Sequence, residues 1–435
     1  MKARHDAVVI GGSFAGAASA VALAREGLDV LLLEPGLADA RRLAGELIQA
    51  PGVEALAGIG LLDAVWAAGA VASCGFAIVT PDSEPVVLSY AESEGCHPNG
   101  LAIEHATLAR VLLDTAAATA NVTLVRGRVT SVRQSSHGPA QVTISEGGSE
   151  RTIDTDLVVA ADGRMSKTRE SAGISVKRSE GFRMLGCKLD GEHLPFEGFG
   201  HVFLGGRRPI LCYRVAADSL RIMFELTDDA ADKKQPCEAD LDVLPARIAT
   251  AVRREFAAGR GISAMVFGLS PERAAAGRVA LVGDSGGCVH PITATGVSFC
   301  FKDAALLARC VARSPGDVPR ALLAYNEERA RPMLTRVLLG PLLAEALGDP
   351  APEMKALRDG LLLYWRRDRS GRAASMGLLS THEPSKLVLA REYAKVAAYA
   401  FLGLVDAEKA PPDRVKIALA LGKRAVKVAR DVLAP

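Results

Sequence analysis

Short runs of consecutive apolar residues recur along the first two thirds of the chain and predict buried β-strands. Residues 6–10 (DAVVI) and 28–34 (LDVLLLE) are two such runs, and the alanine-rich residues 15–26 between them predict a helix. A strand, a glycine turn, a helix and a second strand within about 30 residues make a βαβ unit. Residues 156–160 (DLVVA) and 279–283 (VALVG) predict two more strands of the buried parallel type. The pattern therefore predicts an α/β protein built on a Rossmann-type sheet.

The pattern changes twice farther along the chain. From about residue 175 to residue 275 it is mostly that of strands, and after Gly296 it is almost wholly helical. One more helix is predicted at residues 105–120. Further strands are predicted at residues 81–89, 122–132, 141–145, 202–204, 210–215 and 220–226. The parallel sheet is therefore expected to be joined by a strand-rich part and a helical C-terminal part.

Composition excludes two classes of function. A net charge of +2 over 435 residues lacks the basic excess of a nucleic-acid binder, so we expect no nucleic-acid partner. The eight cysteines form no Cys-x-x-Cys pair, and no histidines cluster at metal-ligand spacing, so we expect no metal site. Scattered cysteines are usual for reduced thiols in a cytosolic protein, so the expected location is cytoplasmic.

The C-terminal segment from Arg414 to Leu433 has two distinct faces at helical spacing. One face carries the apolar residues Val415, Ala418, Leu419, Val426, Ala429 and Leu433. Another face carries the basic residues Lys416, Lys423, Lys427 and Arg430. Such a helix either rests on an anionic membrane surface or packs on the protein core with a solvated basic side. No run of about 18 uncharged apolar residues occurs, so membrane contact, if present, is expected to be peripheral.

A glycine loop lies between the first predicted strand and the first predicted helix, with the sequence Gly11-Gly12-Ser13-Phe14-Ala15-Gly16. Glycine at 11 permits a tight turn, and glycine at 16 lets the helix approach the strand. The helix N-terminus then offers free N–H groups to a pyrophosphate. Glu34 ends the second strand, where a carboxylate can accept hydrogen bonds from a ribose. Although Ser13 replaces the middle glycine, the loop predicts a dinucleotide, either FAD or NAD, bound by Gly11, Phe14, Ala15, Gly16 and Glu34.

Two later segments have the same strand-and-turn character. Residues 156–169 (DLVVAADGRMSKTR) contain Asp162, and residues 277–303 contain Asp284 at the end of a buried strand. Together with the glycine loop, these segments resemble the three fingerprints of group A flavoprotein monooxygenases of the para-hydroxybenzoate hydroxylase fold. The resemblance implies FAD as the cofactor, contacted by Val129, Asp162, Asp284, Gly296 and Val297. The carboxylate of Asp284 would meet the ribityl chain, and the helix that begins near Val297 would stabilise negative charge on the reduced flavin.

Within that class, the chain is most similar to squalene epoxidase and its bacterial relatives. Residues 42–49 (RLAGELIQ) resemble the family segment Arg-x-x-Gly-Glu-x-x-Gln, which implies that Arg42 lies against FAD and Gln49 lies near the substrate. Residues 301–303 (FKD) and 377–380 (GLLS) are also similar to the family. Two positions depart from it: Ala294-Thr295-Gly296 replaces a glycine-rich stretch, and Phe76 replaces a pocket tyrosine.

The resemblance implies an FAD-dependent monooxygenase that places one oxygen atom of O2 on a carbon–carbon double bond through a flavin C4a-hydroperoxide. The expected substrate is lipophilic, either an isoprenoid, a polyene or a prenylated heteroaromatic. We expect Gln49, Phe76, Phe203 and His290 to line the pocket or to serve as its core packing. His290 would either donate a hydrogen bond to the flavin or cap the backbone. No acid–base residue is predicted, because an alkene attacks the electrophilic oxygen directly.

Two other activities stay open at this point. One is hydroxylation of an electron-rich aromatic ring of the quinolone or indole type, and the other is flavin-dependent reduction of prenyl double bonds. The electron donor is expected to be NAD(P)H or a partner flavin reductase.

The expected organisation has three parts. A discontinuous FAD-binding domain comprises residues 1–80, 100–172 and 276–345. A β-rich substrate-binding domain comprises residues 81–99 and 173–275. Residues 346–435 form the C-terminal helical region.

Overall fold

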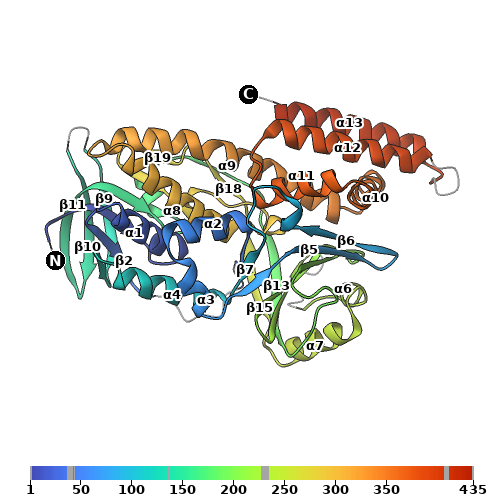
Figure 1. Cartoon of the computed structure of the whole chain (residues 1–435), viewed down its shortest axis with the longest axis horizontal. Helices are drawn as coiled ribbons and strands as arrows, with labels where there is room; N and C mark the ends of the chain where they lie inside the picture. The colour runs from blue at the N-terminus through green and yellow to red at the C-terminus, as the bar shows by residue number, and fades with distance from the viewer. Residues whose placement is uncertain are drawn as a thin grey trace.

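The computed structural model describes residues 2–36, 43, 45–135, 138–226, 235–405 and 411–433. Among the described residues, the strands form two large sheets and two small ones, helices pack around the sheets, and a group of helices lies at the C-terminal end (Figure 1). The α/β class predicted from the sequence is confirmed, with the para-hydroxybenzoate hydroxylase-like arrangement of a Rossmann-type sheet, a β-rich layer and C-terminal helices.

The first sheet has eight strands, and its central path runs β19-β20-β11-β1-β2-β8. β1, β2, β8, β11 and β20 are parallel to their neighbours on this path, whereas β19 is antiparallel. The strands are β1 (Arg4–Ile10), β2 (Val30–Leu33), β8 (Val122–Val125), β9 (Arg128–Arg133), β10 (Ala140–Glu146), β11 (Ser149–Ala160), β19 (Ala275–Ala276) and β20 (Val279–Leu281). Because the parallel strands run the same way, their carboxyl ends meet at one edge, as in Rossmann sheets.

Both faces of this sheet are covered, which explains the continuous apolar runs in its strands. On one face, Ala7 and Val9 pack in a core with α1 (Phe14–Arg25), α4 (His105–Ala118) and α8 (Gly296–Ala312). On the other face, Val8 packs in a second core with residues of β9 and β10. The predicted strand at 122–132 is two strands, because β8 pairs with β2 whereas β9 pairs with β10.

The second sheet has seven strands in the order β17-β13-β16-β15-β14-β5-β6 and is antiparallel except between β14 and β5. Its strands are β5 (Gly75–Thr80), β6 (Ser83–Ser89), β13 (Phe182–Asp190), β14 (Gly200–Phe203), β15 (Ile210–Ala216), β16 (Ser219–Glu225) and β17 (Ile262–Val266). The boundary expected at residue 80 is wrong for β5, because this strand pairs with β6 and β14 and not with the first sheet. One face packs on α6 (Glu238–Leu241) and α7 (Ala246–Ala257), which were not predicted.

Smaller elements join the two sheets. They are β3 (Leu47–Ile48), β4 (Val71–Ser73), β7 (Gly100–Ala102), β12 (Val176–Arg178), β18 (Leu269–Pro271), α2 (Ala50–Ile59), α3 (Leu62–Ala67), α5 (Lys167–Ser171) and 3-10 turns at Tyr90–Glu92, Gly283–Gly286 and Pro291–Thr293. β3, β4 and β7 form a three-stranded sheet, and β12 pairs with β18.

The last third of the chain is helical, as predicted. It comprises α9 (Val318–Gly348), α10 (Pro352–Arg367), α11 (Arg369–Ser380), α12 (Lys386–Val405) and α13 (Arg414–Leu433). α9 extends from the first sheet to the C-terminal helices, where α12 and α13 lie side by side at the outer edge (Figure 1). Within the described part of the chain, no helix has the length and apolarity needed to cross a membrane.

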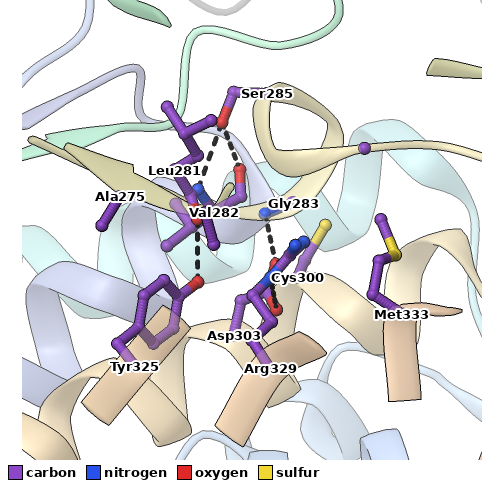
Figure 2. Close-up of polar contacts among 12 residues, drawn as sticks. Ala275, Leu281, Val282, Gly283, Ser285, Cys300, Asp303, Tyr325, Arg329 and Met333 are labelled. Carbon is purple, nitrogen blue, oxygen red and sulfur yellow. Dashed lines mark hydrogen bonds and ion pairs between the residues drawn. The ribbon is translucent and has the colours of Figure 1, made fainter. Parts of the chain in front are cut away.

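A buried ion pair fixes the end of β20 to α8 and α9. Arg329 on α9 donates to both carboxylate oxygens of Asp303 on α8, over 2.7 and 2.9 Å, and both side chains are buried. The backbone N–H of Gly283 donates to the same carboxylate over 2.9 Å, and the Tyr325 hydroxyl donates to the carbonyl of Leu281 over 2.8 Å (Figure 2). The strand-end loop after β20 is therefore tied to two helices.

We predict that Asp303→Ala lowers the free energy of unfolding by about 3–5 kcal/mol, because the charge of Arg329 stays buried without its partner. Urea unfolding followed by circular dichroism measures the effect. Asp359→Ala, which removes the exposed pair between Lys355 and Asp359, is the control and should change stability by less than about 1 kcal/mol. Equal losses in the two variants would contradict the structural role of the buried pair.

Candidate active site

A cavity of about 1010 Å³ lies between the two sheets. One end is formed by the loops that follow β1, β2, β11 and β20, and the other by the second sheet. Of the cofactor residues expected from the sequence, those that line the cavity are Gly11, Phe14, Ala15, Glu34, Val129, Asp162, Asp284, Gly296 and Val297. Segments that are far apart in the sequence therefore converge on one space.

The glycine loop is shaped by two close contacts. Gly11 has a φ of +101°, and a Cβ at this position would lie 2.5 Å from the carbonyl oxygen of Ala161. Gly16 does not line the cavity, but a Cβ there would lie 1.7 Å from the carbonyl oxygen of Gly11. α1 begins at Phe14 after the N-cap Ser13, whose side chain makes no capping hydrogen bond. The first N–H groups of α1 are thus open to an anionic group of a ligand.

Glu34 is held under this loop at the end of β2. Its carboxylate accepts hydrogen bonds from the backbone N–H groups of Gly12, over 2.6 Å, and Gly36, over 2.9 Å. The side chain is buried and lines the cavity. These contacts fix the orientation of a carboxylate at the wall of the cavity.

Asp162 carries an oxygen that lacks a partner. Its Oδ2 atom accepts from the N–H and hydroxyl of Thr168, over 3.1 and 3.0 Å. Its Oδ1 atom is buried and has no hydrogen-bond donor among the described residues. A buried acceptor left in this state costs about 1–3 kcal/mol. We infer that a donor from a bound ligand satisfies Oδ1.

Asp284 has a partner that the sequence did not predict. Arg164 donates from Nε to Asp284 Oδ2 over 2.9 Å, and both side chains are partly exposed in the cavity. The buried Arg169 donates to the carbonyls of Ser285, over 3.1 Å, and Arg164, over 3.0 Å. Arg169 therefore links the loop after β11 to the loop after β20.

The N-terminus of α8 forms another side of the cavity. Gly296 and Val297 line it, and the N-cap residue Thr295 makes no side-chain capping hydrogen bond. A Cβ added to Gly296 would have no neighbour within 4 Å. Ala294 has a φ of +49°, in the left-handed region where a glycine is usual. The free N–H groups and the positive end of the helix dipole are available to a ligand that accepts hydrogen bonds.

The second sheet forms the apolar end of the cavity. Phe76 lines it as predicted, together with Met184, Leu211, Tyr213, Met223, Val266 and Ile292. Burial raises the pKa of the Tyr213 hydroxyl well above its usual value. Glu46 also reaches the cavity, and it forms a buried ion pair with Arg221 through two hydrogen bonds of 2.8 Å. The charged groups at this end are therefore neutralised by each other.

Two of the expected pocket residues lie elsewhere. The Gln49 side chain is fully buried away from the cavity, where its amide donates to the carbonyls of Thr293 and Leu379 and accepts from the Tyr90 hydroxyl over 3.1 Å. Phe203 is also fully buried and belongs to the core on the opposite face of the sheet. Phe203 therefore serves as core packing, which is one of its two predicted roles, and alternation along β14 turns Val202 toward the cavity side of the sheet instead.

His290 lines the cavity and caps the backbone, which is one of its two predicted roles. Its Nδ1 atom accepts from the N–H of Ile292 over 3.2 Å, and its Nε2 atom lies 3.3 Å from a carboxylate oxygen of Glu225. The ring stacks on Phe182 with centroids 4.7 Å apart. Arg42, which was expected to contact FAD, lies outside the described residues.

Sequence reasoning missed Glu46, Arg164, Tyr213 and Arg336 among the residues that line the cavity. Glu46 and Arg164 lie within residues 42–49 and 156–169, which resemble family motifs, so the sequence held a signal for both. Tyr213 and Arg336 lie on β15 and α9, outside every recognised motif.

A Rossmann-type sheet whose strand-end loops meet a β-rich layer around one cavity, together with the family and the relatives that match the chain, places it among the group A, FAD-dependent flavoprotein monooxygenases. The chain belongs to the family described as FAD binding domain, which matches residues 4–338. It is 28% identical to squalene epoxidase erg1 of Schizosaccharomyces pombe, over 88% of each chain. It is also 28% identical to ubiquinone hydroxylase UbiL of Rhodospirillum rubrum, over 82% of this chain and 85% of that protein.

A solved structure with a similar fold is p-nitrophenol 4-monooxygenase PnpA from Pseudomonas putida DLL-E4. The TM-score is 0.71 at 18% sequence identity, over 91% of this chain and 99% of that chain. This likeness concerns the fold alone.

The residues present fit FAD. The loop at Gly11 and Gly16 would leave room for a pyrophosphate. Glu34 holds a carboxylate at the cavity wall where a ribose could meet it, and Asp162 has a buried oxygen that needs a donor. At the far end, the uncapped N-terminus of α8 can meet the flavin ring. An extended dinucleotide satisfies all of these groups at once, because they lie along one cavity.

We predict that Gly16→Ala abolishes FAD binding or weakens it by more than about tenfold, because the added methyl group displaces the Gly11 carbonyl and the helix N-terminus. Titration of the FAD-free protein, followed by flavin fluorescence, measures the change. Gly58→Ala on α2 is the matched control, since a Cβ there would have no neighbour within 4 Å. FAD affinity in Gly16→Ala equal to that of the control would show that the loop does not hold the cofactor.

Proposed function

We propose that the protein transfers one oxygen atom from O2 to a carbon–carbon double bond of a lipophilic substrate, which gives an epoxide. The substrate class is an isoprenoid, a polyene or a prenylated heteroaromatic. The observation that carries this proposal is the apolar end of the cavity, where Phe76, Met184, Met223 and Val266 form walls without a free charged group in the described structure.

The ionisable groups at this end favour an alkene over a phenol. Hydroxylation of a phenol is helped by a base that removes the proton of the phenol hydroxyl and makes the ring more nucleophilic, whereas an alkene has no acidic proton to lose. Glu46 is engaged by Arg221, and His290 is engaged by the N–H of Ile292 and by Glu225. These groups are therefore better suited to holding the walls in place than to accepting a proton from a substrate.

When bound and reduced, FAD supplies the activation of dioxygen. The chain itself has to hold the double bond near the flavin ring and to exclude water from it. The side chains of Phe76 and Met223 can do both, because they give the substrate an apolar surface and offer ordered water no strong hydrogen-bonding group. The buried Gln49 supports the turn at Thr293 and is not among the described residues that line the cavity.

The relatives support this reading and also name an alternative. Squalene epoxidases of several organisms match more than four fifths of this chain, whereas UbiL is named as a ubiquinone hydroxylase. One observation favours ring hydroxylation: Tyr213 lines the cavity with its hydroxyl next to Glu46, and such a hydroxyl can hold a polar ring substituent. Hydroxylation of an aromatic ring of the quinolone or indole type is therefore the second candidate.

We predict that turnover under oxygen-18 gas places one labelled atom in an epoxide when the substrate panel contains terpenoid and prenylated compounds. Tyr213→Phe should keep this activity, because the double bond needs no hydrogen bond from the hydroxyl. Mass spectrometry of the products measures both. A labelled phenol that is lost in Tyr213→Phe would instead establish ring hydroxylation, and anaerobic saturation of a double bond would establish a prenyl reductase.

The electron donor is proposed to be NAD(P)H or a partner flavin reductase. Anaerobic stopped-flow mixing of the flavin-loaded protein with each nicotinamide separates them. Rapid bleaching of the flavin by a nicotinamide alone supports direct reduction, whereas bleaching that needs an added reductase supports the partner.

We also propose that α13 contacts an anionic membrane surface. The face that packs on the protein is formed by Ile417, Leu421, Val428 and Val432, all of which are buried. The apolar stripe expected from the sequence faces outward instead, with Val415, Leu419 and Val426 exposed by 68%, 63% and 72%. Helical spacing places Lys416, Lys423, Lys427 and Arg430 beside this stripe, and all four are exposed. An exposed apolar stripe bordered by cations is typical of helices that lie on anionic bilayers.

We predict that replacing Val415, Leu419 and Val426 together by serine weakens sedimentation with phosphatidylserine-containing vesicles at least about tenfold, because burial of these side chains in the bilayer is lost. The buried face is left intact, so the helix should stay folded. A second variant, with Lys416, Lys423 and Lys427 replaced by glutamine, should bind neutral vesicles as the unaltered protein does and anionic vesicles less. Unchanged sedimentation of both variants would refute this contact.

A further inference from the structure

Two side chains with positive charge lie between α8, α9 and the cavity without a carboxylate partner among the described residues. Arg336 on α9 is 2% exposed, and Lys302 on α8 is partly buried. Across the described ranges, neither forms an ion pair within 4 Å, whereas the neighbouring Arg329 is paired with Asp303. Both cations lie over the ring of Phe299, with the Arg336 guanidinium carbon 4.3 Å and the Lys302 ammonium 5.1 Å from its centroid.

Arg336 is the one of these two cations that reaches the cavity. Its Nε atom donates to the hydroxyl of Thr295 over 2.8 Å, and its Nη1 atom lies 3.4 Å from the carbonyl oxygen of Gly287, to which it donates. Thr295 is the N-cap of α8 and shares a hydroxyl–hydroxyl hydrogen bond of 3.0 Å with Thr293. All of these acceptors are neutral. The guanidinium therefore supports the turn at the N-terminus of α8, but its charge is not balanced there.

A buried cation without a counter-charge is unfavourable, because the charge has lost its hydration. Burial lowers the pKa of Arg336 to about 10, although the carboxylates of Asp284 and Asp303 act in the opposite direction. The group still carries its charge at neutral pH. A buried guanidinium beside a ligand cavity has a lower free energy when the ligand carries negative charge.

We propose that Arg336 is a positioning residue that holds the Thr295 turn against the cofactor and stabilises the negative charge which FAD carries after reduction. Two electrons and one proton from the electron donor convert the neutral flavin ring into an anion, and Arg336 supplies neither. The field of the guanidinium adds to that of the uncapped α8 N-terminus, which points into the same part of the cavity. This inference rests on FAD binding in the cavity, not on the identity of the substrate.

The test compares Arg336→Met, which removes the charge and keeps much of the volume, with Arg336→Lys, which keeps the charge. Sulfite is the probe, because it adds to oxidised flavin and leaves a negative charge on the ring. We expect sulfite to bind about tenfold more weakly to Arg336→Met and within about threefold of the unaltered protein to Arg336→Lys. A tenfold change in the corresponding two-electron reduction would lower the midpoint potential by about 30 mV, which a dye-coupled titration measures. Arg331→Met, at an exposed position of the same helix, is the control and should change neither value.

A second pair of variants keeps Arg336 in place. Met333 lies beside it, with Sδ 3.7 Å from Nη1, so Met333→Glu supplies the missing carboxylate and Met333→Gln is its neutral control. Met333→Glu should weaken sulfite binding relative to Met333→Gln, and this comparison holds even if Arg336→Met does not fold. Equal sulfite affinity within both pairs, or equal losses in Arg336→Met and Arg336→Lys, would overturn the inference. Absence of FAD from the unaltered protein would instead overturn FAD binding itself.

Discussion

The parallel arrangement of β1, β2, β11 and β20 is the constraint on which the site depends. Parallel strands end at a common edge, so loops that are more than a hundred residues apart meet there. Buried polar contacts fix the positions of the loops at this edge. Arg169 joins two of the loops, and the ion pair between Asp303 and Arg329 ties the loop after β20 to α8 and α9. Contacts within the chain therefore fix the positions of the loops that line the cavity.

The two ends of the cavity differ in polarity: one end suits a polar cofactor, and the other suits an apolar substrate. The first sheet presents backbone N–H groups, helix N-termini and the carboxylates of Glu34, Asp162 and Asp284, which suit a polar, extended cofactor. The second sheet presents aromatic, thioether and aliphatic side chains, with Glu46 and Arg221 neutralising each other. The turn at Thr295 lies between the two ends, and Arg336 donates a hydrogen bond to the Thr295 hydroxyl. A few residues at the start of α8 therefore separate the polar end of the cavity from its apolar end.

Sequence patterns predicted the elements whose structure is set by residues close together in the chain. The βαβ unit, the glycine loop and the carboxylate at Glu34 follow from apolar runs, a required turn and a strand end, and the structure places each as expected. The features that the sequence did not predict depend on contacts between residues far apart in the chain. β5 joins the second sheet because its partners β6 and β14 lie there. Phe203 faces the core on the side of the sheet away from the cavity, because the alternation of a short strand does not reveal which of its two faces meets the cavity. Arg336 could not be found, since a lone arginine in a long helix has the same pattern whether it faces solvent or a cofactor.

The central claim is that the separated loops hold one FAD molecule across the edge of the first sheet. Titration of the purified, flavin-free protein with FAD, followed by equilibrium dialysis, tests it most directly. The account predicts saturation at one FAD per chain, with quenching of flavin fluorescence and protection against unfolding. A protein that stays colourless and retains no FAD after dialysis would contradict the claim, and the proposed oxygen chemistry would then have no source.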